Sequence, residues 1–285
     1  MADELIDFVW RIPTAGYQWI SAECLGKEES PQRYLVYASG EPVQPARDYS
    51  PFVSTSGLFK RFAETAPTEK GIAAFANKFG WLGGRLTSGP LSAAEGTPRL
   101  YGETFNSWQE TIKCMADIVT LWECAKLGKL SAISRQVFWK GNAVFHRSRD
   151  RQNLEVIASE HLYPELLAGF SRGDLQLPAM YAVQRQINRE LAKHTASPKL
   201  LWHRGQLVLR QSATSLIGAI WLQFAKAVEG NKGYRQCENC REWIEIGGRR
   251  AARSDKRFCT PSCKSAAWQR DAKLRALEQA SKKGR

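Results

Sequence analysis

Four of the seven cysteines lie in two close pairs near the carboxyl end of the chain. Two residues separate Cys237 from Cys240, and after eighteen more residues three residues separate Cys259 from Cys263. Thiolates at this spacing are typical ligands of one tetrahedral zinc ion. Because four protein ligands leave no coordination position for water or substrate, the spacing predicts one structural Zn²⁺ and no metal chemistry.

The segment between the two pairs must bring the four sulfurs together. Trp243-Ile-Glu-Ile246 has the alternation of a short strand, and Gly247-Gly248 is a turn signal. Lys256-Arg-Phe258 is then expected to be the returning strand, which leads into Cys259. The sequence therefore predicts a hairpin beside the metal.

A helix is predicted to supply the last ligand. Thr260 is a suitable N-cap, and Pro261 is tolerated at the first helical position, where its missing N–H would have no partner. Cys263 then falls in the first turn, where the amide dipoles favour a thiolate. A knuckle, a hairpin and a helix together predict a treble-clef zinc finger.

The string from Tyr234 to Arg270 resembles the C-terminal fingers of bacterial CGNR-type proteins, which follow a helical region sometimes called an ABATE domain. Those fingers have a Cys-x-x-Cys pair, an aromatic strand, an Arg-rich stretch, an aromatic-Cys-Ser/Thr element, a further cysteine and a basic helix. The name-giving Cys-Gly-Asn-Arg string is absent, and Cys263-Lys-Ser-Ala266 stands in its place. The resemblance implies the same zinc ligands and a role in transcription regulation. The matching residues are Cys237, Cys240, Trp243, Arg253 to Phe258, Cys259, Thr260 and Cys263.

Positive charge is concentrated in the predicted finger. The whole chain carries +13, and residues 232–285 account for +9 with fifteen Lys and Arg against six Asp and Glu. Four thiolates around Zn²⁺ explain only two of these charges, so the surplus favours a polyanionic partner. DNA is the favoured partner, although composition alone does not distinguish it from RNA. The expected nucleic-acid-binding residues are Arg249, Arg250, Arg253, Lys256 and Arg257 on the hairpin, and Lys264, Arg270 and Lys273 on the helix.

The predicted fold class is α+β, with a mainly helical mixed α/β body over residues 1–230 and the finger over residues 231–285. Gly230-Asn-Lys-Gly233 is the expected flexible joint, and a sub-boundary is expected near residue 105. Short strands are predicted within the first fifty residues, turns over 88–97, and a strand or short helix over 138–146. A hairpin is predicted over 200–209. Helices are predicted over 57–64, 68–79, 107–127, 154–170 with an interruption at Pro164, 180–193 and 212–229.

Enzymatic signals are weak, so an enzyme is not the favoured interpretation. All four histidines precede residue 232, whereas a nuclease of the HNH kind would need its base inside the finger. The sequence has no nucleophile elbow and no phosphate-binding glycine loop. An acidic start without an apolar core, and no stretch long enough to span a bilayer, favour a cytoplasmic protein without a membrane partner. Reduced Cys24, Cys114 and Cys124 are expected to be apolar fillers.

Two functional hypotheses follow. In the first, the chain is a DNA-binding transcription regulator, and the body supplies homodimerisation or senses a signal. In the second, the finger is a structural or protein-docking module, and the body is a ligand-binding or enzymatic domain. Trp243, Phe258 and Trp268 bear on this choice, because they can either stack on bases or pack within the small finger.

Overall fold

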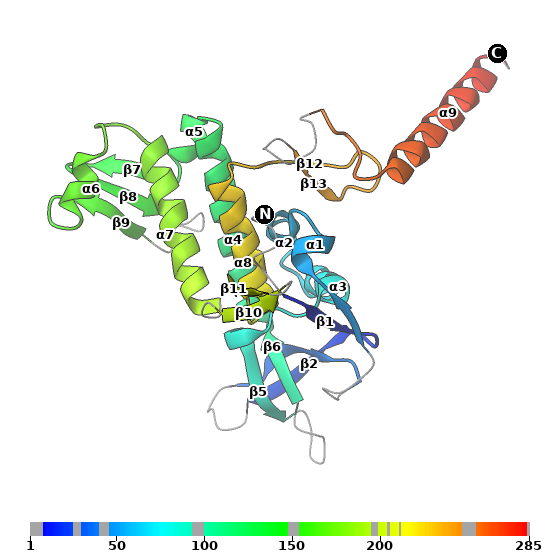
Figure 1. Cartoon of the computed structure of the whole chain (residues 1–285), viewed down its shortest axis with the longest axis horizontal. Helices are drawn as coiled ribbons and strands as arrows, with labels where there is room; N and C mark the ends of the chain where they lie inside the picture. Colours follow the sequence, from blue (N-terminus) through cyan, green and yellow to red (C-terminus); the bar gives the residue numbers. More distant parts are fainter. Residues whose placement is uncertain are drawn as a thin grey trace.

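The protein is an α+β molecule in which three long helices stand together and small sheets surround them (Figure 1). The computed structural model describes residues 8–24, 30–39, 46–92, 100–147, 154–194, 199–203, 206–210, 212–246 and 255–283. Within these ranges, no helix is both long enough and apolar enough to cross a lipid bilayer.

The amino-terminal region forms two antiparallel sheets. Strand β1 (Trp10–Pro13) pairs with β4 (Ala46–Tyr49), and β2, β3, β6 and β5 close into a small barrel in that order. The barrel encloses a cluster of buried side chains that includes Tyr34, Val36 and Leu91. The strands predicted within the first fifty residues are therefore present. The barrel strands are β2 (Tyr17–Cys24), β3 (Gln32–Tyr37), β5 (Thr87–Ser92) and β6 (Leu100–Thr104).

The turns predicted over residues 88–97 are wrong for the first part of that segment, because Thr87–Ser92 forms β5. Strand β5 pairs with both β2 and β6, and its register with β6 shifts between Ser88 and Leu91. The irregular pairing accommodates the Gly-Pro step that favoured a turn. Residues 93–97 lie outside the described ranges.

Three short helices and one helical turn connect these sheets to the core. Helix α3 (Glu69–Phe79) begins as predicted, with the Thr68 hydroxyl accepting a hydrogen bond from the Gly71 N–H at 3.2 Å. The buried Glu103 carboxylate accepts hydrogen bonds from the N–H groups of Leu82 and Gly83. Burial raises the pKa of Glu103 to about 7, against the opposing effect of those hydrogen bonds. The other elements are α1 (Pro51–Ser54), α2 (Leu58–Ala63) and the 3-10 turn η2 (Gly84–Leu86).

Helices α4 (Phe105–Lys126), α7 (Gln176–His194) and α8 (Leu216–Glu229) form the centre of the body. They bury large aromatic side chains, among them Trp108, Trp122 and Trp221, in one cluster. The same cluster also contains buried residues from the segment before position 105, where a sub-boundary was predicted. The helices predicted over 107–127, 180–193 and 212–229 correspond to α4, α7 and α8, with differences at their starts.

The predicted starts of two helices are corrected. Thr104 caps α4, and its hydroxyl accepts a hydrogen bond from the N–H of Ser107, so the helix begins before the predicted residue 107. Ser215 caps α8 in the same way through the N–H of Gly218, so that helix begins after Ser212. More than one hydroxyl residue lies near the start of each helix, and the local backbone decides which of them caps it.

A third sheet covers one side of α7. Strands β7 (Val137–Lys140), β8 (Ala143–Arg147) and β9 (Leu154–Ser159) pair in sequence order. The helix predicted over 154–170 is therefore wrong in its first part, because β9 completes this sheet and buries Ile157 and Ala158. Pairing with β8 outweighs the helical pattern there. The flanking helices are α5 (Leu130–Ile133) and α6 (Pro164–Ala168).

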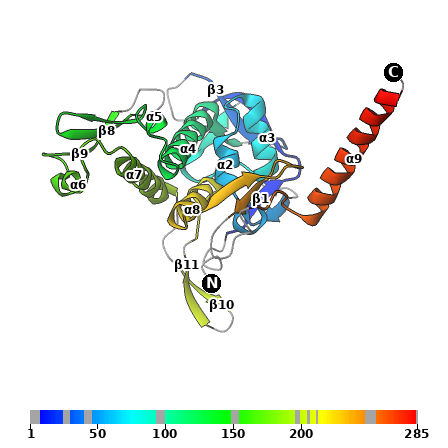
Figure 2. The ribbon, with the colours of Figure 1, turned by 90° about the horizontal axis from the view of Figure 1, so that it is seen from above.

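The remaining elements are two hairpins and one helix. The hairpin of β10 (Lys199–His203) and β11 (Gln206–Arg210) is confirmed. Strands β12 (Gly233–Gln236) and β13 (Trp243–Ile246) follow α8 and form the second hairpin. Helix α9 (Pro261–Lys283) then extends away from the body in both overall views (Figures 1 and 2).

Candidate metal centre

The first cysteine pair lies in the turn between β12 and β13. The Cys237 N–H donates to the Glu242 carbonyl at 2.8 Å, and the Arg241 N–H donates to the Cys237 carbonyl at 2.9 Å. Arg241 adopts a left-handed conformation with φ of 61°, which tightens the turn. This geometry buries Cys237 completely and directs both sulfurs of the pair to one side.

The hairpin beside the metal centre differs from the predicted one. Strand β13 pairs with β12, with Gln236 opposite Trp243 and Gly233 opposite Ile246. The predicted returning strand Lys256-Arg-Phe258 is not a strand. The cysteine turn joins β12 to β13 directly, so the partner closest in sequence takes the edge of β13.

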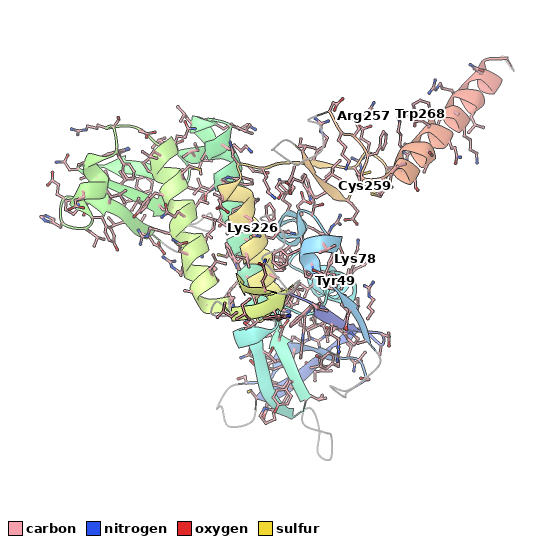
Figure 3. All side chains as sticks on the ribbon, in the orientation of Figure 1. Tyr49, Lys78, Lys226, Arg257, Cys259 and Trp268 are labelled. Atoms are coloured by element: carbon pink, nitrogen blue, oxygen red, sulfur yellow. The ribbon has the colours of Figure 1, made fainter. Side chains whose placement is uncertain are left out.

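The second cysteine pair lies at the start of α9, as predicted. The Thr260 hydroxyl accepts a hydrogen bond from the Cys263 N–H at 3.2 Å, and α9 begins at Pro261. Cys259 therefore precedes the cap, and Cys263 occupies the first helical turn. Figure 3 labels Cys259 at the base of α9.

The four sulfur atoms form one cluster, and all of them lie within 4.8 Å of one another. The Cys259 sulfur lies 3.5 Å from that of Cys240 and 3.3 Å from that of Cys263. Tetrahedral coordination with metal–sulfur bonds of about 2.3 Å separates sulfurs by roughly 3.8 Å. The donor set and its spacing therefore fit a single metal ion, which Cys237, Cys240, Cys259 and Cys263 would hold.

The electrostatics of the cluster favour a bound cation. Burial raises the pKa of Cys237, but N–H donors of Cys240, Cys259 and Asn239 outweigh it and bring that pKa to about 6. Burial and the neighbouring sulfurs raise the pKa of Cys259 to about 12. Four thiols this close cannot all ionise without a compensating positive charge.

Side chains in the first pair's turn tie the turn to the segment around α9. The Glu238 carboxylate holds the Arg257 guanidinium through two hydrogen bonds of 2.6 Å, and the Glu238 N–H donates to the Arg257 carbonyl at 3.1 Å. Arg270 on α9 donates to the Asn239 side-chain oxygen at 3.0 Å. The two halves of the cluster are therefore joined by polar contacts as well as by their sulfurs.

The predicted nucleic-acid-binding residues separate into three groups. Arg249, Arg250 and Arg253 lie outside the described residues. Lys256 is half-buried, and Arg257 is exposed but paired with Glu238. The exposed members on α9 are Lys264, Arg270 and Lys273, and Arg275 joins them.

The three aromatic side chains of the finger have different environments. Trp243 and Phe258 are half-buried, whereas Trp268 on α9 is 65% exposed. The Lys264 ammonium lies 5.5 Å from the centre of the Trp268 ring. Figure 3 shows Trp268 on the projecting helix. Packing within the finger therefore does not account for Trp268.

The β12–β13 hairpin rests on the body, which the sequence did not reveal. The Glu242 carboxylate forms ion pairs with Arg61 of α2 at 2.6 Å and with Lys78 of α3 at 2.7 Å. The Trp243 indole N–H donates to Glu64 at 3.0 Å, and the Lys60 ammonium lies 4.2 Å from the Trp243 ring. The acidic and aromatic residues beside the first cysteine pair were the one feature of the sequence that could have indicated this contact with the body.

The joint before the hairpin is also tied to the body. The Lys126 ammonium donates to the carbonyls of Asn231 and Lys232 at 2.8 Å each. Tyr234 packs edge to face on Phe59, with ring centres 5.2 Å apart, and belongs to the edge of the main core. The hairpin thus extends the core of the body across the predicted boundary.

The other cysteines, and the histidines whose side chains the structure describes, do not join the cysteine cluster. Cys24 is buried in the barrel, while Cys114 and Cys124 are half-buried at the edge of the main core, as expected of apolar fillers. The His194 imidazole lies 3.5 Å from Glu190 within α7, and His161 is exposed. Among the described residues, the cysteine cluster is the one group found with metal-ligand spacing.

Comparison with models of protein families, with curated proteins and with solved structures finds no match for this chain. The class of protein that the fold and the site define is therefore an α+β protein with a cluster of four cysteines that could hold a metal ion. The resemblance to CGNR-type fingers stays a prediction from the sequence.

Proposed function

We propose that this chain is a nucleic-acid-binding protein whose finger is organised by one structural Zn²⁺. The observation that carries the proposal is the position of α9, which starts at the cysteine cluster and projects from the body with exposed basic side chains (Figure 3). The metal would fix the base of this helix through Cys259 and Cys263. A treble-clef arrangement of knuckle and helix accords with this geometry.

Electrostatics support a phosphate polymer as the partner. Lys264, Arg270, Lys273 and Arg275 are exposed on α9, and Asp271 is its one described exposed acidic side chain. Lys and Arg neutralise phosphates and release counterions, so affinity should fall steeply with salt concentration. Such contacts position a protein on nucleic acid without reading its sequence.

One face of α9 also offers a stacking surface. Lys264, Trp268 and Arg275 follow the spacing i, i+4 and i+11, which places them along one side of the helix. An exposed indole flanked by cations can stack on an unpaired base. DNA binding in transcription regulation, as in CGNR-type proteins, is the specific form of the proposal, and it rests on the sequence string alone.

The test compares two triple variants of the full chain with equal charge change. Lys264, Lys273 and Arg275 are replaced by Gln in one, and the exposed body residues Lys113, Lys140 and Arg172 in the other. Affinity for labelled duplex DNA, single-stranded DNA and RNA is measured at two salt concentrations. We expect the first variant to lose at least tenfold affinity and the second to bind like the parent chain. Equal losses, or no binding by the parent at low salt, would refute the proposal.

A second candidate function has its own support in the docked hairpin. Because Tyr234, Glu242 and Trp243 contact the body, the metal centre can serve as a structural module that stabilises it. Removal of the metal by a chelator would then lower the midpoint of thermal unfolding of the whole chain. Unchanged unfolding of the body after chelation would exclude this role.

A further inference from the structure

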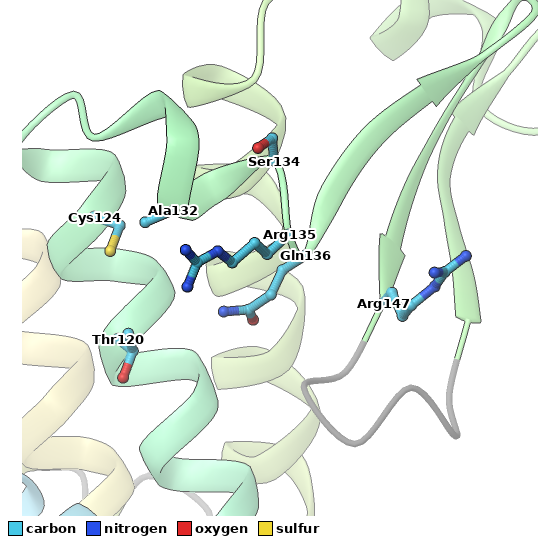
Figure 4. Close-up of a pocket in the computed structure, with 7 residues that line it drawn as sticks. All are labelled: Thr120, Cys124, Ala132, Ser134, Arg135, Gln136 and Arg147. Carbon is cyan, nitrogen blue, oxygen red and sulfur yellow. The ribbon is translucent and has the colours of Figure 1, made fainter.

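A cavity of about 460 Å³ lies between α4, α5 and the end of the β7–β8 hairpin (Figure 4). Helix α4 contributes Thr120 and Cys124, which are one turn apart. The remaining lining residues are Ala132 of α5, Ser134, Arg135 and Gln136 of the loop that follows, and Arg147 at the end of β8.

Gln136 is a buried polar side chain aimed into this cavity. Its side chain is only 5% exposed, and its Oε1 atom has no hydrogen-bond partner among the described residues. The backbone holds it in place, because the Gln136 N–H donates to Ile133 and the Gln136 carbonyl accepts from Arg147. A buried acceptor without a partner is costly, and a ligand that donates a hydrogen bond would remove that cost.

Arg135 supplies positive charge to the same space. Figure 4 shows its side chain extending toward Cys124, while the Gln136 amide points toward Thr120. Arg135 is exposed and forms no ion pair with a described residue. Arg147 differs, because Figure 4 shows its side chain pointing away from the cavity, and its guanidinium lies 4.8 Å from the Phe138 ring centre.

The lining restricts the chemistry of a ligand. The guanidinium of Arg135 favours a carboxylate or phosphate. Thr120 already donates its hydroxyl hydrogen to the Ala116 carbonyl at 2.7 Å, so its oxygen can only accept, and the Gln136 amide adds the unpartnered acceptor Oε1 beside its donor nitrogen. Since none of the described lining residues is acidic, a neutral hydroxyl suits these acceptors better than an ammonium group.

We propose that this cavity binds a small oxyanion that carries a hydroxyl group. Arg135 binds the anionic group, and Gln136 accepts a hydrogen bond from the hydroxyl. The site is independent of the nucleic-acid proposal, because it shares no residue with the finger. It would give the body a ligand-binding function.

Cys124 provides a built-in reporter, because its half-buried side chain is part of the cavity lining (Figure 4). Iodoacetate and iodoacetamide both alkylate the cysteine thiolate, whose sulfur bonds to the CH₂ carbon while iodide leaves. Only iodoacetate is an anion. In the full chain, mass spectrometry of the Cys124 peptide gives the alkylation rate with each reagent. The iodoacetate rate divided by the iodoacetamide rate measures how strongly the site attracts an anion. We expect Arg135→Gln to lower this ratio at least threefold and Arg147→Gln, the matched control, to leave it unchanged.

Protection experiments test the hydroxyl group. Glycerate, glycerol 3-phosphate and propionate are added as probes, and slower alkylation of Cys124 by iodoacetamide reports occupancy. We expect protection by glycerate or by glycerol 3-phosphate, and weaker protection by propionate. Which of the first two protects better shows whether the ligand is a carboxylate or a phosphate. Gln136→Met should remove the advantage of the hydroxylated probes.

Three results would overturn the proposal. The first is an equal fall of the rate ratio in the Arg135 and Arg147 variants, or no fall in either. The second is absence of protection by both hydroxylated probes. The third is equal protection by glycerate and propionate in the parent chain. The iodoacetamide rate by itself shows whether a variant has merely opened the cavity.

Discussion

The two halves of the finger have opposite relations to the body. The β12–β13 hairpin packs on α2 and α3 through Tyr234, Glu242 and Trp243, whereas α9 projects with Trp268 exposed (Figure 2). Each half carries two of the four cysteines. The comparison teaches that the cysteine cluster connects a hairpin that packs on the body to a helix with exposed side chains. Stability and binding should therefore depend on different residues.

The largest expected effect comes from removing one cysteine of the cluster that connects the hairpin to α9. Cys259→Ser removes a ligand from the second pair, and structural zinc contributes about 10 kcal/mol or more to the folding of small fingers. We expect the purified variant to lose its metal, measured by elemental analysis, and α9 to become more sensitive to trypsin. Cys124→Ala, outside the cluster, should keep one metal per chain. A Cys259→Ser protein that retains its metal would contradict the assigned ligands.

The next effect separates the two tryptophans. Trp243→Ala removes a half-buried ring from the interface with α2, and we expect a loss of about 2 kcal/mol in the free energy of unfolding. Trp268→Ala should change that free energy by less than about 0.5 kcal/mol, because the ring is exposed. Urea denaturation of both variants measures the difference. Similar losses in the two would mean that α9 packs against the chain.

A smaller effect concerns the ion pairs beneath the hairpin. Glu242→Gln removes the partner of Arg61 and Lys78, and we expect it to cost about 1 kcal/mol at low salt. The cost should shrink in concentrated salt, because these groups are partly exposed. Asp48→Asn, which breaks an exposed pair with Arg11, serves as the control and should cost less. A loss that does not depend on salt would point to packing instead of charge.

The smallest effect concerns single basic side chains that are exposed on α9. Lys264→Gln should reduce the slope of log affinity against log salt by about 1, if that ammonium neutralises one phosphate. Lys140→Gln, an exposed charge on β7, should leave the slope unchanged. Titrations of labelled DNA at several salt concentrations provide the slopes. An unchanged slope for Lys264→Gln would remove this residue from the proposed interface.

Local signals in the sequence were sufficient for much of the fold and the site. Cysteine spacing indicated the cluster, and Thr260 with Pro261 indicated the start of α9, because caps and ligand pairs depend on neighbours in the chain. The error over residues 154–170 arose because β9 is defined by its pairing with β8. The partner of β13 was missed for the same reason.

The sequence by itself determined the four cysteines that form the cluster, the cap of the last helix and the concentration of positive charge near the carboxyl end. These features are set by residue types a few positions apart. Only the tertiary structure decided that Trp243 is covered while Trp268 is exposed, and that Gln136 and Arg135 face one cavity with Cys124. Those outcomes depend on which distant segments pack together, and contacts between distant segments leave no local pattern in a single sequence.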